Sequence, residues 1–407
     1  MFNRRTLILD TLNKKNLVFF IVLSCIFMQS LGMGPAYRFF AYLNLLLVIL
    51  IGFSQYRKNP TFINRSTLGG LFFIPFAFIT IHFLAVENFI FLKEIRHIFI
   101  AVFLSLGIWI SARINPDYIK RNTFAWLLLL IMSYVLIQAA ALWYLNLPYG
   151  TTKNPHYLAV YSALMLIASL FCFLKVSKIL KFVLAICALC LGIFLLHSLS
   201  RPAWIGLIVS AFLLLFFVNK RTKLISASAI VLSLAGLIMT NVGNFATRFG
   251  DLLGHLSTEE RVVIWRDTWR MQLESSPNEW LLGHGLNSFK TDFMPFSYYH
   301  LQNMDFNSPH NFFLELLYIS GAIGLVLAVS LYWIIYRKLI VSINNQTEYK
   351  NIYLLLLAVL TTNLILVSIT LPFFSSYNIN VIAIVFGVIL YLQEINPNPR
   401  HKNHTVQ

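Results

Sequence analysis

One histidine in the chain is placed where proton-transfer chemistry is plausible. It lies in the stretch SPHNFFLELLYISGAIG, from Ser308 to Gly324, where polar residues give way to a long apolar run. Ser308 is expected to cap a helix and Pro309 to take its first position, so that His310 and Asn311 fall in the first turn. The positive end of the helix dipole disfavours an imidazolium ion there, which leaves His310 neutral and able to accept a proton. His310 is therefore a candidate general base, and an interfacial histidine with a packing role is the alternative.

Two glycines and one carboxylate follow His310 on the same predicted helix. Gly321 and Gly324 fall near the face of His310, at about 100° per residue, and small residues on a face allow another helix to approach closely. Glu315 is one turn below Asn311 and is the clearest acidic group within a predicted membrane helix. An ionisable residue in such a place is expected to serve the site or to partner a nearby base.

A second candidate is an arginine between two apolar stretches. Arg201 belongs to the segment SLSRPAW, which connects those stretches in only a few residues. A guanidinium group offers a planar fork of donors that matches phosphate oxygens, so Arg201 is predicted to hold a phosphate. The alternative is an arginine that extends its charge to the membrane surface.

Three further arginines lie on a predicted amphipathic helix. Ser257 and Glu260 have the spacing of a capping box, and one apolar face is expected to follow from Val262, Trp265, Trp269 and Leu273. Arg261 is one turn before Trp265, where it is expected to reach an anionic head group, whereas Arg266 and Arg270 lie nearer the polar side. The spacing alone does not select one of the three.

Two other segments offer weaker signals. Lys153, with Asn154 and His156 in NLPYGTTKNPHYL, is a further candidate cation, although a surface loop explains it as well. Gly283 and Gly285 flank His284 in a glycine pair that resembles a phosphate loop only weakly. A plain turn is the expected structure there.

The elements that carry these residues are predicted to be membrane helices. The chain has 407 residues, of which 58% are hydrophobic and 11% charged, whereas soluble domains carry roughly 25% charged residues. Each long apolar stretch suffices to cross about 30 Å of hydrocarbon as a helix. The fold class is therefore all-α, a polytopic membrane protein. The twelve predicted spans are 17–33, 37–55, 69–86, 95–112, 124–146, 157–174, 179–197, 203–219, 223–241, 309–335, 351–371 and 376–392.

The distribution of basic residues sets the predicted orientation. The net charge is +16, but the basic residues form short groups between apolar spans, which argues against a nucleic-acid partner. With the amino terminus inside, 21 of the 31 Lys and Arg residues fall on the cytoplasmic side. Both termini are therefore predicted to be cytoplasmic, with membrane lipids as the surroundings.

One long connection divides the chain into three parts. Residues 1–241 are predicted to hold nine spans, residues 242–308 a periplasmic loop with the amphipathic helix, and residues 309–407 three spans and a cytoplasmic tail. Long loops without an obvious domain of their own are usually functional. The four cysteines all fall in apolar spans, where core packing is expected rather than a disulfide or a metal site.

These residues together resemble the O-antigen ligase family. The pattern H[NSQ]x9Gxx[GTY] fits His310, Asn311, Gly321 and Gly324, and an SR pair at Ser200 and an RxxxW at Arg261 add to the resemblance. About twelve spans and one large periplasmic loop before the histidine are also similar.

The resemblance implies a specific reaction at the periplasmic face of the bacterial inner membrane. The fold would be GT-C-like, and the chemistry an inverting glycosyl transfer without metal or other cofactor. The donor would be O-antigen on undecaprenyl pyrophosphate, and the acceptor lipid A-core oligosaccharide. His310 would deprotonate the acceptor hydroxyl, and Arg201 and Arg261 would hold the departing pyrophosphate, with Asn311, Glu315 and Lys153 as possible supporting residues.

Three alternatives remain at the level of the sequence. An O-antigen polymerase uses the same donor, but resembling polymerases carry Rx10G repeats in periplasmic loops, and the one such spacing, Arg96 to Gly107, runs into a predicted span. A protein O-oligosaccharyltransferase is expected to add a soluble region after the last spans. A transporter of lipid-linked sugars is expected to place several ionisable groups at mid-membrane. The ligase is therefore the preferred hypothesis.

Overall fold

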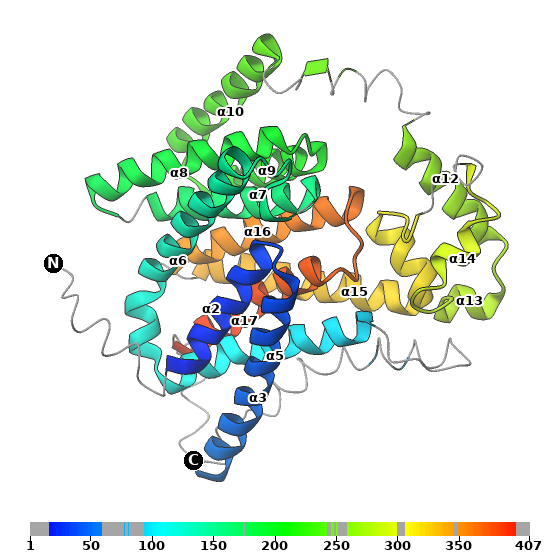
Figure 1. Cartoon of the computed structure of the whole chain (residues 1–407), viewed down its shortest axis with the longest axis horizontal. Helices are drawn as coiled ribbons and strands as arrows, with labels where there is room; N and C mark the ends of the chain where they lie inside the picture. Colours follow the sequence, from blue (N-terminus) through cyan, green and yellow to red (C-terminus); the bar gives the residue numbers. More distant parts are fainter. Residues whose placement is uncertain are drawn as a thin grey trace.

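In the computed structural model, the described residues are 16–58, 77, 80, 93–152, 154–173, 176–241, 246–247, 250, 259–298, 306–345 and 349–395. They are mostly helical and include no strand (Figure 1). The helices are α2 (Leu17–Ser30), α3 (Gly34–Lys58), α5 (Lys93–Ile114), α6 (Pro116–Ala139), α7 (Pro155–Phe173), α8 (Lys178–His197), α9 (Arg201–Leu214), α10 (Lys220–Thr240), α12 (Glu260–Leu273), α13 (Pro277–Leu282), α14 (Phe289–Phe293), α15 (Phe312–Asn345), α16 (Lys350–Ile369) and α17 (Ser376–Ile395), and the short segments are η3 (Ala140–Tyr144), η4 (Gly150–Thr152) and η5 (Leu215–Phe217).

The all-α polytopic class predicted from the sequence is confirmed. Among the described residues, eight helices are long and apolar enough to cross a membrane, namely α3, α5, α6 with η3, α7, α8, α15, α16 and α17. The apolar helices α2 and α9 are shorter. Every predicted span coincides with a helix except 69–86, which lies almost entirely outside the described residues.

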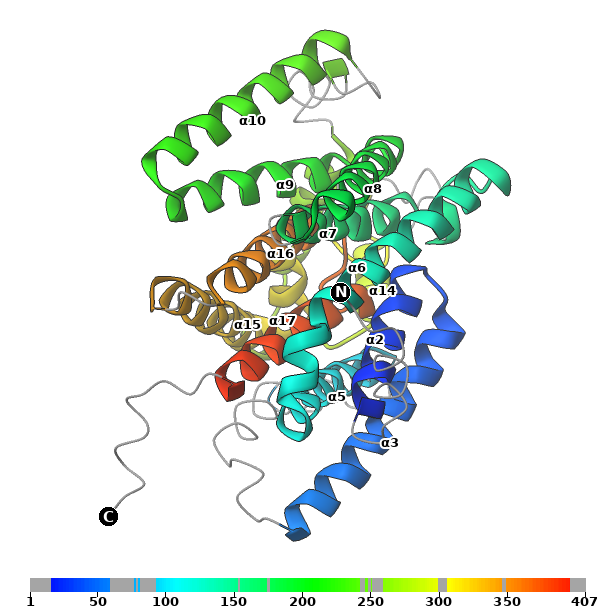
Figure 2. The same ribbon diagram turned by 90° about the vertical axis from the view of Figure 1, so that its left-hand side faces the viewer.

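The carboxy-terminal helices form the middle of the bundle. Figure 2 shows α15, α16 and α17 between α2, α3 and α5 on one side and α7, α8 and α9 on the other, with α10 standing apart beyond α9. Small and polar residues mediate the close contacts: Ser105 of α5 donates to the Ala383 carbonyl of α17 at 2.8 Å, and Ser210 of α9 donates to the Ala358 carbonyl of α16 at 3.1 Å. Such contacts are typical of helices that pack within a membrane.

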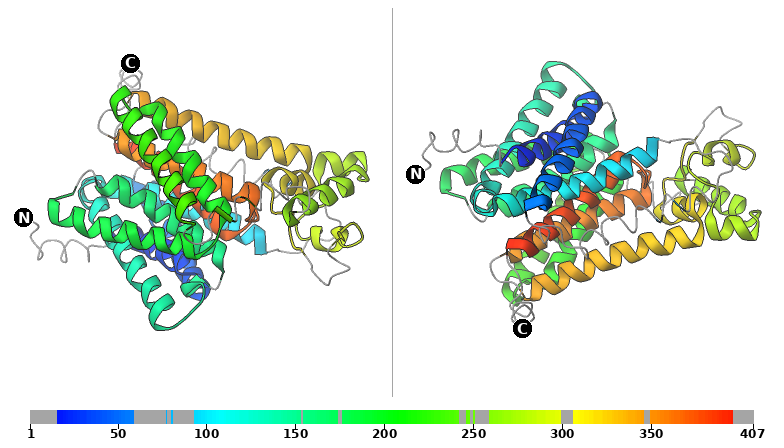
Figure 3. Two further views of the ribbon diagram at one scale, coloured as in Figure 1. Left: turned by 90° about the horizontal axis from the view of Figure 1, so that it is seen from above. Right: turned by 90° about the horizontal axis from the view of Figure 1, so that it is seen from below.

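Helices α12, α13 and α14 form a small unit at one end of the bundle, called the loop subdomain below. Figure 3 shows it against the start of α15. Of the residues on the predicted apolar face of α12, Val262 and Trp265 are half-buried and Trp269 and Leu273 are exposed, whereas Asp267, Thr268 and Gln272 are buried. Their side chains turn into the subdomain, where Asp267 accepts a hydrogen bond from the Tyr298 backbone at 3.2 Å. The described residue that precedes α12 is Glu259, whose side chain makes no capping bond, and Ser257 lies outside the described residues.

Helix α15 is broken at Gly321, where φ is +63° and ψ is −172°. The break frees the carbonyls of Tyr318 and Ile319, which accept hydrogen bonds from the backbone of His284 at 2.8 Å and of Gly285 at 2.9 Å. A β-carbon at Gly321 would lie 2.2 Å from the Leu281 carbonyl oxygen. The expected close approach therefore exists, but to the end of α13 rather than to another membrane helix. The regular 100° spacing does not extend across the break.

Replacing Gly321 by alanine should destabilise the protein. The backbone conformation there is nearly exclusive to glycine and costs other residues on the order of 1–3 kcal/mol. The new β-carbon would also displace the end of α13. We expect a lower melting temperature in detergent for Gly321→Ala. Gly192→Ala is the matched control, since its β-carbon would meet no atom within 4 Å. Equal melting of both variants and wild type would contradict this account of the break.

Candidate functional site

The start of α15 differs from the predicted one. The helix begins at Phe312, and the Asn311 side chain caps it by accepting from the backbone of Phe313 at 3.0 Å and of Leu314 at 3.1 Å. Asparagine is among the most favoured capping residues, and here it satisfies two of the free N–H groups. His310 therefore precedes the helix with φ +52°, and its expected place in the first turn is wrong. Its backbone N–H donates to the Ser308 hydroxyl at 3.3 Å.

The His310 ring is held in a partly buried and positively charged environment. Burial lowers the pKa of His310 to about 4, and the charges of Arg261 and His156 act in the same direction. A backbone hydrogen bond with Thr370 raises this pKa but does not offset the other causes. His310 is thus neutral at physiological pH, because of burial and the charge of Arg261 rather than the helix dipole alone.

Arg261 and Trp265 of α12 reach both segments beside His310. The guanidinium Nη1 of Arg261 donates to the Ile369 carbonyl at 2.8 Å, and the Trp265 indole donates to the Pro309 carbonyl at 3.0 Å. The RxxxW spacing therefore places one side chain on each side of the histidine. Arg266 and Arg270 are exposed, and Arg266 contacts Asp267 at 3.4 Å. The geometry singles out Arg261 among the three arginines.

Arg201 opens α9 and faces the loop subdomain. Its guanidinium forms an ion pair with Glu259, and the two side chains are 24% and 22% exposed. Burial lowers the pKa of Arg261, and the charge of Arg201 contributes in the same direction, so the two guanidinium groups are close enough to repel each other. Ser200 is buried, with its hydroxyl 3.4 Å from Nδ1 of His156 at the start of α7.

Glu315 is buried below the histidine and contacts a different segment. Its Oε2 accepts from the Phe373 backbone at 2.9 Å and its Oε1 from the Phe374 backbone at 3.4 Å. These residues belong to the turn between α16 and α17, from Ile369 to Ser375, called the 369–375 turn below. Of the site residues expected from the sequence, His310, Arg261 and Glu315 therefore contact this turn. Arg201 lies close to Arg261 instead, and Lys153 lies outside the described residues.

Sequence reasoning missed two parts of the site. Glu259 is close to Arg261 in the sequence, which is the only signal that it belongs there. The 369–375 turn contributes backbone groups, and a backbone hydrogen bond cannot be predicted from the type of residue.

Among the described residues, no group of three His, Cys, Asp or Glu side chains is arranged to hold a metal ion.

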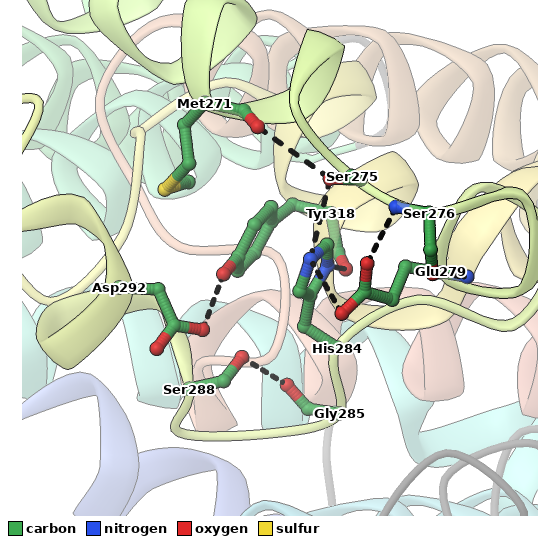
Figure 4. A network of polar contacts seen from close by, with 9 residues as sticks. All are labelled: Met271, Ser275, Ser276, Glu279, His284, Gly285, Ser288, Asp292 and Tyr318. Atoms are coloured by element: carbon green, nitrogen blue, oxygen red, sulfur yellow. Dashed lines mark hydrogen bonds and ion pairs between the residues drawn. The ribbon is translucent and has the colours of Figure 1, made fainter.

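A polar network holds the loop subdomain on α15 (Figure 4). The His284 ring stacks on the Tyr318 ring with centroids 4.1 Å apart, and His284 Nε2 lies 3.2 Å from the Ser275 hydroxyl. The Tyr318 hydroxyl donates to Asp292 at 2.5 Å. Because α12 carries Arg261 and α15 follows His310, this network fixes the relative position of the two residues.

The comparison with known families bears directly on this arrangement. Residues 185–329 match the model of the O-antigen ligase family. This segment belongs to that family. The matched segment contains Arg201, Arg261 and His310, and the predicted family resemblance is confirmed. No curated protein matches the chain.

The ligase segment does not build the site alone. His156 of α7 precedes it, and the 369–375 turn follows it, yet both contact residues of the segment. Helices on each side of the ligase segment thus complete the surroundings of His310. The described residues that surround His310 come from both halves of the chain.

Removing the Arg261 charge should raise the pKa of His310, because the imidazolium would lose a repelling neighbour. Diethylpyrocarbonate acylates neutral imidazole, so its rate of reaction with His310 against pH reports this pKa. We expect the midpoint to rise in Arg261→Ala. Arg266→Ala, which removes an exposed arginine from the same helix, should leave the midpoint unchanged. An unshifted midpoint in Arg261→Ala would show that the guanidinium does not act on His310.

Proposed function

We propose that the protein is an O-antigen ligase of the bacterial inner membrane. It transfers O-antigen from undecaprenyl pyrophosphate to lipid A-core oligosaccharide at the periplasmic face, with both termini in the cytoplasm. The supporting observation is that a neutral histidine lies beside the guanidinium group of Arg261, which is in turn close to that of Arg201 on a separate helix. The family of the ligase segment, whose superfamily also includes O-antigen polymerases, supports the same class of reaction.

The proposed reaction is a single displacement at the anomeric carbon. The acceptor hydroxyl attacks from the side opposite the pyrophosphate, so that one carbon–oxygen bond forms while the bond to the pyrophosphate breaks and the configuration inverts. The hydroxyl proton passes to His310. The bonding electron pair stays on the pyrophosphate oxygen that was attached to the sugar, and the leaving group is undecaprenyl pyrophosphate. The leaving group is already competent, so the protein mainly aligns the two substrates and stabilises the developing charge.

Arg201 and Arg261 supply the positive charge in this proposal. A guanidinium fork matches pyrophosphate oxygens, and two such groups close together suit a doubly charged diphosphate better than a single carboxylate. Glu259 neutralises Arg201 in the structure, and we propose that the incoming pyrophosphate exchanges with it. The reaction would then need no divalent metal.

One structural observation favours the ligase over the polymerase. The Arg96 to Gly107 spacing lies wholly within α5, and a β-carbon at Gly107 would lie 2.4 Å from the Asn44 side chain of α3. Gly107 thus serves helix packing rather than a periplasmic glycine repeat. Ligation to lipid A-core is therefore preferred over polymerisation as the proposed reaction.

Purified protein tests the function directly. With lipid-linked O-antigen and lipid A-core, it should form lipopolysaccharide in excess chelator, and cells without it should accumulate lipid-linked O-antigen beside normal lipid A-core. Longer lipid-linked chains without ligation would indicate a polymerase. Activity that is lost on chelation and restored by a metal would contradict the metal-independent step.

His310→Ala should nearly abolish ligation in this assay. General-base catalysis contributes about 10²- to 10⁴-fold, and kcat should fall within that range while expression and membrane insertion are retained. The measurement is initial rate at saturating substrates. Tyr298→Phe, which alters an exposed side chain of the loop subdomain, is the control and should keep wild-type kcat. A near wild-type rate for His310→Ala would return His310 to a packing role.

Neutralising Glu259 should strengthen donor binding. Ion pairs that are partly exposed contribute up to about 1 kcal/mol, so the donor KM of Glu259→Gln should fall by up to about 5-fold. Arg201→Ala should raise the same KM and lower kcat, and Arg201→Lys should recover only part of the loss because the fork of donors is absent. Glu274→Gln, at the other end of α12, should leave the donor KM unchanged. A higher donor KM in Glu259→Gln would contradict the exchange.

A further inference from the structure

The 369–375 turn carries backbone groups that contact both the base and a cation. The Ile369 carbonyl accepts from Arg261, and the backbone of Thr370 hydrogen-bonds to the His310 ring. Neither contact uses a side chain of the turn. The positions of Arg261 and His310 therefore depend on whatever holds this backbone in place.

Two side-chain braces hold the turn, and Glu315 is the one that connects it to the helix after His310. Its carboxylate accepts from the backbones of Phe373 and Phe374, as described above. The other brace is Asn378 of α17, which donates to the Phe373 carbonyl at 2.7 Å and accepts from Asn363 at 2.5 Å. Both braces meet at Phe373, but only Glu315 links the turn to α15.

The Glu315 contact closes a ring of interactions around the site. The Glu315 backbone donates to the Asn311 carbonyl at 2.8 Å, in the first turn of α15. From there the ring runs through the Glu315 side chain to Phe373, along the turn to Thr370, and back to His310. Because a helix turn is rigid, displacement of Glu315 would move Thr370 relative to His310.

A buried carboxyl group holds the turn at a cost in folding free energy. Glu315 is 2% exposed, and its two backbone partners are neutral N–H groups. Burial of a carboxyl group costs free energy that an apolar side chain of the same volume would avoid. The geometry nevertheless requires two acceptors at this point, and a carboxylate is the side chain that presents two acceptor oxygens and no donor.

We propose that Glu315 is a positioning residue for the transfer reaction: it holds the 369–375 turn, which in turn orients Arg261 and His310. This inference rests on the proposed function for its effect on catalysis, but not for its effect on the geometry of His310. Glu315 does not touch the substrates. It acts through the backbone of Ile369 and Thr370.

Two substitutions of Glu315 separate positioning from bulk stability. Glu315→Ala removes both acceptors, and Glu315→Gln keeps one acceptor while its amide N–H₂ opposes the second N–H. A misplacement of about 1 Å lowers kcat by on the order of 10²-fold, so we expect that loss in Glu315→Ala and a smaller loss in Glu315→Gln. Tyr336→Phe is the matched control, because it breaks a 3.0 Å hydrogen bond from α15 to Thr361 of α16, away from the turn.

The second measurement does not depend on activity. The rate at which diethylpyrocarbonate modifies His310, followed by mass spectrometry of the His310 peptide, should increase several-fold in both Glu315 variants and stay unchanged in Tyr336→Phe. If Glu315→Ala does not fold, Glu315→Gln decides. A folded Glu315 variant with wild-type kcat and a wild-type His310 modification rate would overturn the proposal. Full activity of His310→Ala would instead refute the proposed function, while the modification rate would still test the role of Glu315.

Discussion

The break in α15 at Gly321 is the constraint on which the site depends. An unbroken helix would keep the carbonyls of Tyr318 and Ile319 in its own hydrogen bonds, and a side chain at position 321 would leave no room for the end of α13. With the break, those carbonyls bind the backbones of His284 and Gly285, and the loop subdomain is attached at a fixed point. A segment outside the membrane bundle thereby acquires a defined position relative to the helix that follows the histidine.

The same attachment explains why separate sequence motifs act together. Gly321 of the histidine motif packs against the loop subdomain. Arg261 and Trp265 on α12 donate to the backbone of the two segments beside His310. Arg201 at the start of α9 forms an ion pair with Glu259, which precedes α12. Each motif thus contacts a segment that another motif holds in place. Removing one contact is expected to loosen the others, since residues that share partners do not contribute independently.

The sequence predicts the helices and the candidate residues better than their local geometry. Hydropathy is sufficient for the spans because every membrane helix must be long and apolar. It does not predict the start of α15. The Asn311 side chain caps this helix, whereas the Ser308 hydroxyl accepts from the His310 backbone before the helix begins. Hydropathy also gives no sign that Asp267 and Gln272 of α12 are buried, because polar side chains are mostly exposed. The 369–375 turn escapes sequence reasoning entirely, since its contribution is made by backbone groups.

The charges at the site link base strength to donor occupancy in the proposed reaction. Without a donor, Arg261 and burial keep the pKa of His310 near 4, so the imidazole is a weak acceptor of protons. A bound pyrophosphate would bring negative charge to Arg261 and Arg201, which would offset that repulsion and raise the basicity of His310. The base would then be strongest when the leaving group is in place, and a sugar hydroxyl or water that arrived first would meet a poor base. Such an arrangement favours binding of the donor before the acceptor is activated. It follows from the proximity of the neutral imidazole to Arg261 and of Arg261 to Arg201.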